Sequence, residues 1–438
     1  MSDHRPPTRS GRLSALGRAL RHRNYRLFFI GQTLSLIGTW MTRVATAWLV
    51  YRLTESPLLL GVVGFAGQAP VFVLAPIAGV LADRWNRYRV LVTTQVLAMI
   101  QSALLAALAL SGRITVTHVI VLAVCQGLIN AFDMPSRQAL VVHMVDDRAD
   151  LPNAIALNSS MVNAARLVGP SIAGMVIAWV GEGTCFLVDS VSYLAVIASL
   201  LAMRLALPVR SAVPKHVAAE LKAGFRYAAG FAPIRALLGL LALMSLAAMP
   251  YTVLMPIIAS KILHGGAHTL GFLMAASGLG ALAAGAYLAA RHTVLGLGRV
   301  IAAAVIATGV GLIGISQSTL LWSAMALMPV IGAGVMIQIA ASNTVLQTIV
   351  EEEMRGRVMS FYTMAFVGTM PFGSLLAGAF AQRFGAPTTL LFGGVACLGS
   401  AAVFTMRLPA LRRLVRPIYV RLGIIPEVAE GLRDVSRL

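Results

Sequence analysis

Apolar residues fill long windows along almost the whole chain, and short polar segments separate each window from the next. A helix needs roughly 20 apolar residues to cross a bilayer whose hydrocarbon core is about 30 Å thick. Inside lipid, backbone groups must bond within their own segment, which favours helices. The pattern therefore predicts an all-α membrane protein with twelve transmembrane helices, at residues 27–51, 57–81, 90–110, 116–136, 154–180, 184–205, 236–259, 269–290, 299–316, 320–343, 358–381 and 388–406.

Composition excludes a soluble protein. Only 12% of the 438 residues are charged, whereas a soluble domain carries about 25%. The net charge of +19 would suit a nucleic-acid binder, but nearly all Lys and Arg residues lie in the two tails and the even-numbered loops. Position thus argues against a nucleic-acid partner. The odd-numbered loops hold only Arg52, Arg113, Lys261 and Arg383.

This asymmetry indicates topology, because cytoplasmic loops of membrane proteins carry an excess of Lys and Arg. We expect a multi-pass protein of a bacterial-type cytoplasmic (inner) membrane, with both termini in the cytoplasm and basic segments against an anionic inner leaflet. Aromatic residues gather at membrane interfaces. Four tryptophans fall toward the predicted outer face: Trp40, Trp48, Trp179 and Trp322.

An internal repeat divides the chain. The segment around Gly169 and Gly174 recurs 204 residues later around Gly373 and Gly378, so the fifth predicted helix reappears as the eleventh. We expect two pseudo-symmetric six-helix bundles in parallel orientation. Val217–Ala229 is amphipathic and predicts an interfacial helix, with a plain solvated linker as the alternative. The predicted parts are a basic N-tail (1–24), the first bundle (25–205), a cytoplasmic linker (206–235), the second bundle (236–407) and a basic C-tail (408–438).

Parallel six-helix halves are a transporter architecture, with the substrate site near the bilayer midplane between the halves. The sequence contains no zinc-protease, phosphate-loop or nucleophile-elbow motif. The three cysteines lie in apolar windows without metal-ligand spacing. We therefore predict neither an enzyme nor a cofactor or metal site.

One loop motif carries a family resemblance. Gly79, Asp83, Arg84 and Arg87 lie in the run Gly-Val-Leu-Ala-Asp-Arg-Trp-Asn-Arg between the second and third predicted helices. This run resembles motif A of the major facilitator superfamily. The resemblance implies the major facilitator fold of two six-helix bundles and a working cycle of alternating access.

The same resemblance implies a conformational latch. Asp83 would cap the start of the eleventh helix near Arg357, and Arg84 and Arg87 would pair with Asp146 or Asp147. A carboxylate at a helix N-terminus is favourable because it meets exposed N–H groups and the positive end of the dipole. Such a latch would stabilise the state that is closed on the cytoplasmic side; a merely solvated basic loop is the alternative.

A second motif lies on the fifth helix. Gly169, Pro170 and Gly174 stand in a run that resembles the antiporter motif of the superfamily, which is associated with exporters. Close packing of small residues is the competing explanation. With Arg26–Gln32 and Trp48–Pro57, the chain is similar to the enterobactin-exporter-like branch. That resemblance implies proton-coupled efflux of siderophores, drugs or related organic molecules, without naming the substrate.

Charges inside membrane helices are costly and mark functional candidates. Asp133 and Asp189 are the candidates for proton coupling. Arg43 and Asp189 lie at similar depth, so we expect a pair that either fixes the bundle or takes part in gating. Arg166 lies near the predicted midplane and suits substrate contact or a polar network. Asp133 has Arg137 one turn away, so a helix-end ion pair competes with proton uptake.

Polar residues spaced by threes and fours predict stripes that line a central cavity. In the superfamily, helices one, four, seven and ten line it. A polar first half facing a Met-rich second half suits amphipathic molecules, because methionine adapts to varied shapes. The cavity candidates are Gln32, Ser35, Thr39, Arg43, Gln126, Asn130, Arg166, Thr252 and Met328.

The sequence thus predicts a monomeric secondary transporter that exports amphipathic organic molecules in exchange for protons. Two rival hypotheses stay open at this stage. The same fold could run as an uptake symporter. A lipid-handling integral membrane protein is the other, although its expected cluster of His or acidic residues at one interface is not visible.

Overall fold

The computed structural model describes residues 17–204, 217–291 and 293–425, without the side chains of 75–84 and 217–221. The described residues form helices and their connections, with no strand among them. The first half contains η1 (Arg18–Arg21), α2 (Arg23–Thr54), α3 (Pro57–Arg84), α4 (Arg87–Leu110), α5 (Val116–Val141), η2 (Arg148–Asp150), α6 (Leu151–Val180) and α7 (Glu182–Leu201).

The second half follows the connecting helix α8 (Val217–Gly230), which lies where the sequence predicts an amphipathic helix. Two helical spans of the second half are interrupted, and π-helical turns (η3 and η4) lie within them. Its elements are α9 (Ala232–Ala247), α10 (Tyr251–Ile257), η3 (Ile258–Ile262), α11 (Ala267–Ala289), α12 (Leu297–Gln317), α13 (Leu321–Ile349), α14 (Glu352–Thr363), η4 (Met364–Gly368), α15 (Met370–Phe384) and α16 (Ala386–Arg421).

Proline explains one of these interruptions. α9 ends at Ala247, and Pro250, which has no N–H to donate, stands at the start of α10. Proline does not end α16, however, which runs through Pro409 and Pro417 to Arg421. α16 therefore extends beyond the predicted span 388–406, and Leu411 and Val415 remain on a buried face in this extension.

Eleven spans of the described chain are long and apolar enough to cross a membrane. The spans 232–262 and 352–384 each join several of the elements above. α2 is long enough but is not among the eleven. It carries Gln32, Ser35, Thr39 and Arg43, and these polar residues lower its mean hydropathy. The sequence-based count of twelve is therefore supported for eleven spans.

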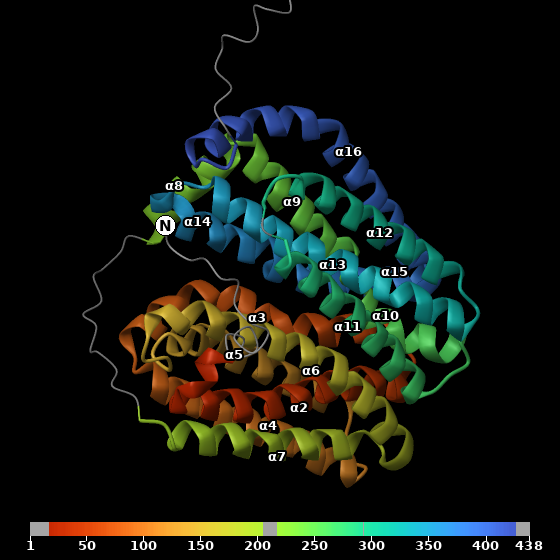
Figure 1. Cartoon of the computed structure of the whole chain (residues 1–438). Coiled ribbons are helices and arrows are strands. Elements are labelled where there is room, and N and C mark those ends of the chain that lie inside the picture. The colour runs from red at the N-terminus through yellow and green to blue at the C-terminus, as the bar shows by residue number, and fades with distance from the viewer. Residues whose placement is uncertain (1–16, 205–216, 292, 426–438) are drawn as a thin grey trace, which may run out of the picture.

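The two halves form separate bundles that meet along two helix pairs (Figure 1). Within the first half, α2 packs on α6 and α7, α3 on α5, and α4 on α5 and α7. Within the second, α13 packs on α11 and α12, and α12 on α16. Between halves, α6 packs on α11 and α3 on α15.

Glycines at matching repeat positions make matching contacts. A Cβ added to Gly169 would meet Trp40 of α2 at 2.5 Å, and one added to Gly373 would meet the backbone of Leu246 in α9 at 2.7 Å. Both glycines therefore permit close contact inside their own half. The duplicated sequence thus gives two bundles with equivalent packing.

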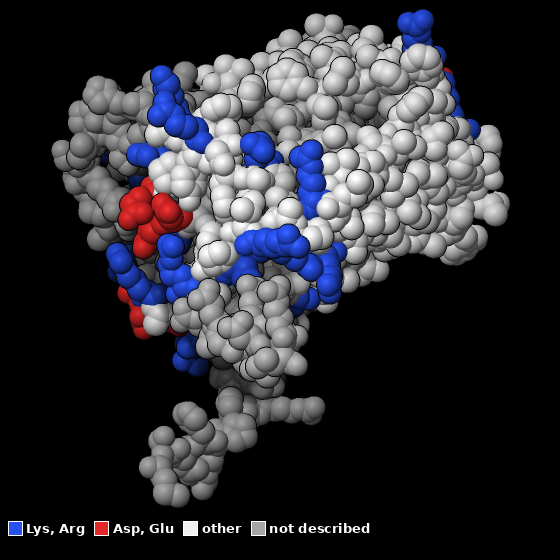
Figure 2. All heavy atoms as spheres, turned by 90° about the horizontal axis from the view of Figure 1, so that it is seen from above, with Lys and Arg blue, Asp and Glu red and all other residues white. Residues whose placement is uncertain are grey.

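Charge distinguishes the two ends of the molecule. Figure 2, which looks onto the side of α16, shows Lys and Arg gathered over one end and an uncharged face beyond it. We call the end with η1, α8 and the start of α12 the basic end. The other, where α2 ends and α7 begins, is the far end. The described residues thus have the asymmetry expected of a membrane protein.

Candidate transport site

Arg43 is the first of the predicted cavity residues. It stands in α2 and is surrounded by protein, yet its side chain keeps solvent-accessible surface. That it lines a central cavity stays a prediction. The guanidinium lies 4.6 Å from the ring centroid of Trp40. A cation over an aromatic face is attracted by the ring quadrupole.

A second arginine shares this ring. The guanidinium of Arg166, on α6, lies 5.7 Å from the Trp40 centroid. It comes this close because Gly169, one turn further along α6, lets that helix pack directly against α2 at Trp40. Trp40 is half-buried and lies close to both guanidinium groups, whereas Trp179 and Trp322 are 82% and 83% exposed. The predicted place of Trp40 at the outer interface stays a prediction.

Asp189 was expected to pair with Arg43, but its hydrogen bonds are made with two hydroxyl groups. Its Oδ2 accepts hydrogen bonds from Thr42 of α2 at 2.9 Å and from Ser102 of α4 at 3.0 Å. Oδ1 is buried and has no hydrogen-bond partner among the described residues. Asp189 therefore joins α2, α4 and α7, with one oxygen still available to take a proton.

Asp133 has a different environment. Its carboxylate accepts from Arg137 one turn along α5, from Thr94 at 3.0 Å and from Gln95 at 2.6 Å. Asp133 therefore holds α4 and α5 together through donors on both helices. Tyr193 of α7 lies close enough to interact electrostatically with both Asp133 and Asp189. The two acids thus belong to one polar region inside the first half.

The remaining cavity candidates divide by exposure. Gln32, Ser35 and Met328 are buried, so these three have little or no surface toward a cavity in this state; Met328 belongs to the core of the second half. The others keep accessible surface, and Gln126 donates to Asn130 at 3.1 Å. The partly accessible candidates are Thr39, Gln126, Asn130, Arg166 and Thr252.

Polar contacts close the far end between the halves. Glu55, just beyond α2, pairs with Lys261 of the second half at 2.9 Å. Ser56 donates to Gln382 of α15 at 3.1 Å. Inside the first half, Arg52 holds the buried Glu182 by two hydrogen bonds of 2.8 and 3.2 Å. Sequence reasoning missed these residues because each lies in a loop or at a helix end, where no periodicity marks it.

Small residues complete this closure. A Cβ on Gly174 of α6 would lie 2.9 Å from Gly271 of α11. A Cβ on Gly378 of α15 would lie 2.8 Å from Gly61 of α3. Pro170 takes part as well, since its carbonyl oxygen faces Gly271. The helix-five motif thus serves close packing both within and between halves.

Part of the motif A loop lies outside the described side chains, including those of Gly79, Asp83 and Arg84. The predicted partners have other contacts. Asp146 lies 3.1 Å from His22, and Asp147 caps η2 by accepting from Ala149 at 2.9 Å. The predicted latch therefore stays a prediction.

α14, the start of the eleventh predicted helix, is covered by α8. A Cβ on Gly224 would meet Arg357 at 2.9 Å, and the rings of Phe225 and Phe361 lie 6.1 Å apart. The connection between the halves therefore lies directly against the helix that the latch would engage.

His22 joins the start of α2 to the loop before α6. Its two ring nitrogens lie 3.1 Å from Asp146 and 3.1 Å from Asp150, and Arg18 lies 3.7 Å from Asp150. Desolvation lowers the pKa of His22, but hydrogen bonds and the charges of both aspartates outweigh it, so the pKa is raised above 6.5.

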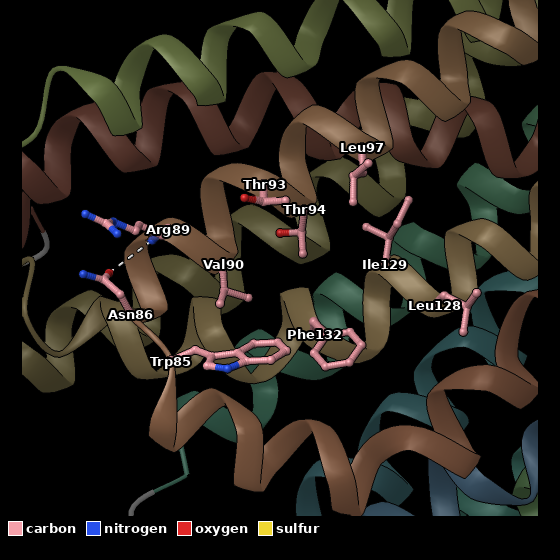
Figure 3. Close-up of a pocket in the computed structure, with 10 residues that line it drawn as sticks. All are labelled: Trp85, Asn86, Arg89, Val90, Thr93, Thr94, Leu97, Leu128, Ile129 and Phe132. Carbon is pink, nitrogen blue, oxygen red and sulfur yellow. Dashed lines mark hydrogen bonds between the residues drawn. The ribbon is translucent and has the colours of Figure 1, made fainter. Parts of the chain in front are cut away.

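A pocket of about 670 Å³ lies at the basic end between α4 and α5 (Figure 3). Trp85 stacks on Phe132 along one side, with ring centroids 6.1 Å apart, and Asn86 caps α4 by accepting from Arg89. Thr94 lines the pocket and bonds Asp133. This pocket lies away from Arg43, so it is not the midplane site expected from the sequence.

A family model described as transmembrane secretion effector matches residues 14–416. The chain belongs to this family of the major facilitator superfamily. The staphyloferrin A transporter of Staphylococcus aureus is 25% identical over 381 residues, which cover 86% of this chain and 95% of that relative. The multidrug efflux pump Tap of Mycolicibacterium fortuitum is 28% identical over 387 residues, covering 86% and 93%.

Solved structures agree on the fold. A crystal structure of peptide transporter POT superposes with a TM-score of 0.71 at 14% identity, covering 90% of this chain and 95% of that one. This member of the transmembrane secretion effector family is therefore a multi-pass membrane transporter of small organic substrates, and not an enzyme.

Proposed function

We propose that the protein exports amphipathic organic molecules from the cytoplasm by alternating access, as a monomer, with proton entry as the driving reaction. The basic end then faces the cytoplasm of a bacterial cell, in accord with the positive-inside bias. The similarity to a named efflux pump supports the direction.

One observation carries the proposal. Arg43 keeps accessible surface deep in the molecule, while Glu55–Lys261, Ser56–Gln382 and the glycine crossings join the halves at the far end. A cavity closed at the far end loads from the basic end. An exporter binds its cargo in this state.

The cavity chemistry suits an amphipathic cargo. Arg43 and Arg166 offer guanidinium donors to the oxygen atoms of a ligand, and the Trp40 ring between them offers an apolar face. Aromatic walls with a few placed polar groups are typical of small-molecule sites. Arg166→Gln should therefore weaken binding, whereas Arg383→Gln, at an exposed position near the far end, serves as the control.

For the proton, the geometry favours Asp189 over Asp133. Asp133 is fully supplied with donors, whereas Oδ1 of Asp189 has none among the described residues. Protonation of Asp189 would turn two charge-assisted hydrogen bonds, from Thr42 and Ser102, into weaker neutral ones. That change loosens α2, the helix that carries Arg43, and so couples proton binding to the cavity.

The latch is the last part of the proposal. Asp83 would engage the start of α14 when the basic end closes, with Arg84 and Arg87 paired to acids of the loop before α6. Gly79, which has no side chain, would allow α3 to come close to α14. Asp83→Asn should then lower transport in a protein that still inserts and folds, and a normal rate in this variant would exclude the latch.

Everted membrane vesicles test the function directly. With a drug or siderophore panel, we expect wild-type protein to accumulate substrate inside the vesicles when the interior is acidified, and accumulation to stop when a protonophore dissipates the gradient. Asp189→Asn should keep substrate binding and lose gradient-driven accumulation. Substrate movement that ignores the proton gradient would refute the coupling. Movement in the reverse direction would favour an uptake symporter.

A further inference from the structure

A second cavity opens at the basic end of the second half. It has a volume of about 360 Å³ and lies between α9, the start of α12, and the last turns of α16. Its walls are apolar and mostly buried, and they belong to helices distant in sequence. Among them are Leu237, Ile301, Phe404, Leu408 and Val415.

Three arginines surround this cavity. Arg412 and Arg416 stand one turn apart on α16, and Arg299 faces them from the first turn of α12. All three are exposed. Among the described residues none of them has a carboxylate partner, and no Asp or Glu lines the cavity. Within the described part of the chain, three positive charges without an acidic partner therefore stand over an apolar pocket.

The position of α16 places this charge at the membrane surface. Its 36 residues extend about 54 Å at roughly 1.5 Å per residue, well beyond a hydrocarbon core of about 30 Å. The last turns, which carry Arg412 and Arg416, thus stand at headgroup level. Figure 2 shows Lys and Arg gathered at this end of the α16 face.

We propose that this cavity binds one anionic phospholipid of the adjacent leaflet. The three guanidinium groups bind the phosphate, and the apolar walls take up part of one acyl chain. Both the phosphate and the acyl chain are needed: free phosphate would leave the apolar walls unfilled, and a zwitterionic lipid would bring its own cationic group next to the three arginines. Basic pockets between membrane helices are known to bind such headgroups.

The bound lipid would fasten α16 to α12. The two helices already touch at the cavity, where a Cβ on Gly298 would meet Leu408 at 2.8 Å. A phosphate between Arg299 and Arg416 would extend this contact toward the membrane surface. The inference does not depend on the direction of transport or on proton coupling.

Native mass spectrometry of the full chain, exchanged into mixed phosphatidylglycerol and phosphatidylcholine, tests the proposal. We expect retention of one phosphatidylglycerol in preference to phosphatidylcholine. Each arginine near the surface contributes about fivefold in affinity, so Arg299→Gln and Arg416→Gln should each weaken retention about fivefold. Arg413→Gln is the matched control, since Arg413 is exposed on the same helix but does not line the cavity.

Two further measurements keep the outcomes separable. Leu411→Phe narrows the cavity without changing any charge, and it should lower phosphatidylglycerol retention while the melting temperature shows a folded protein. Lysophosphatidylglycerol should compete for the site, whereas millimolar inorganic phosphate should not. Equal loss in Arg413→Gln, equal retention of phosphatidylcholine, or competition by inorganic phosphate would each overturn the lipid site.

Discussion

Closure of the far end depends on two glycine crossings, and one added methyl group should disturb it. In Gly378→Ala, the new Cβ would lie 2.7 Å from the carbonyl oxygen of Pro57 and 2.8 Å from Cα of Gly61. These are backbone atoms and cannot rotate away. Ordinary van der Waals contact begins at 3.4 Å, so α3 and α15 must separate by roughly 0.6 Å or more for the methyl group to fit, as overpacking requires.

The magnitude follows from this clash. Overpacking costs about 1–3 kcal/mol, and the cost applies only while the far end is closed. The equilibrium should therefore move toward the far-end-open state by roughly 5- to 150-fold. We expect slower transport as a consequence, because an exporter must return to the far-end-closed state to load.

Spin labels on the far end measure the shift. Trp179 and Trp322 are exposed and lie in different halves, so Trp179→Cys and Trp322→Cys provide a labelled pair. Cys125→Ser removes the one partly accessible native thiol, since the described structure buries Cys185 and Cys397. Electron–electron distance measurements should show a single label-to-label distance in the labelled parent protein. After Gly378→Ala, a population with a longer label-to-label distance should appear.

The control is another helical glycine. Gly399 of α16 has nothing within 4 Å of an added Cβ, so Gly399→Ala should leave the distance distribution unchanged. If Gly378→Ala gives the parent distribution, or if Gly399→Ala shifts it equally, the glycine crossing does not control closure.

Two further predictions concern the first half. Asp133→Asn should destabilise the protein by about 3 kcal/mol, because it leaves Arg137 partly buried without its carboxylate; an unchanged melting temperature would contradict the ion pair. His22, whose pKa is raised by Asp146 and Asp150, should stabilise the fold fully below about pH 6.5 and lose this contribution as the pH rises through its folded-state pKa. Thermal melts from pH 5 to 9 should show that loss in the parent protein, and His22→Gln should remove the dependence; parallel curves for the two would argue against it.

Local sequence was enough to predict much of this architecture. Long apolar windows gave all-helical bundles, because lipid leaves the backbone few alternatives. The repeat predicted that the two halves would match, and Gly169 and Gly373 indeed contact equivalent helices. Periodicity did not reveal the break at Pro250, although the proline is a local signal for it. It did not reveal the extension of α16 either, which depends on the residues that the neighbouring helices bury.

Side-chain partners were decided only by the tertiary structure. The predicted helices place Arg43 and Asp189 at similar depth, but a stripe of residues can face either a neighbouring helix or the cavity. The rotation and spacing of α2, α6 and α7 decide between them. Gly169 brings α6 against Trp40, so Arg166 and Arg43 share one ring, while Asp189 turns to hydroxyl groups instead. Contacts of this kind depend on helix rotation across the fold, and no short window of sequence contains that information.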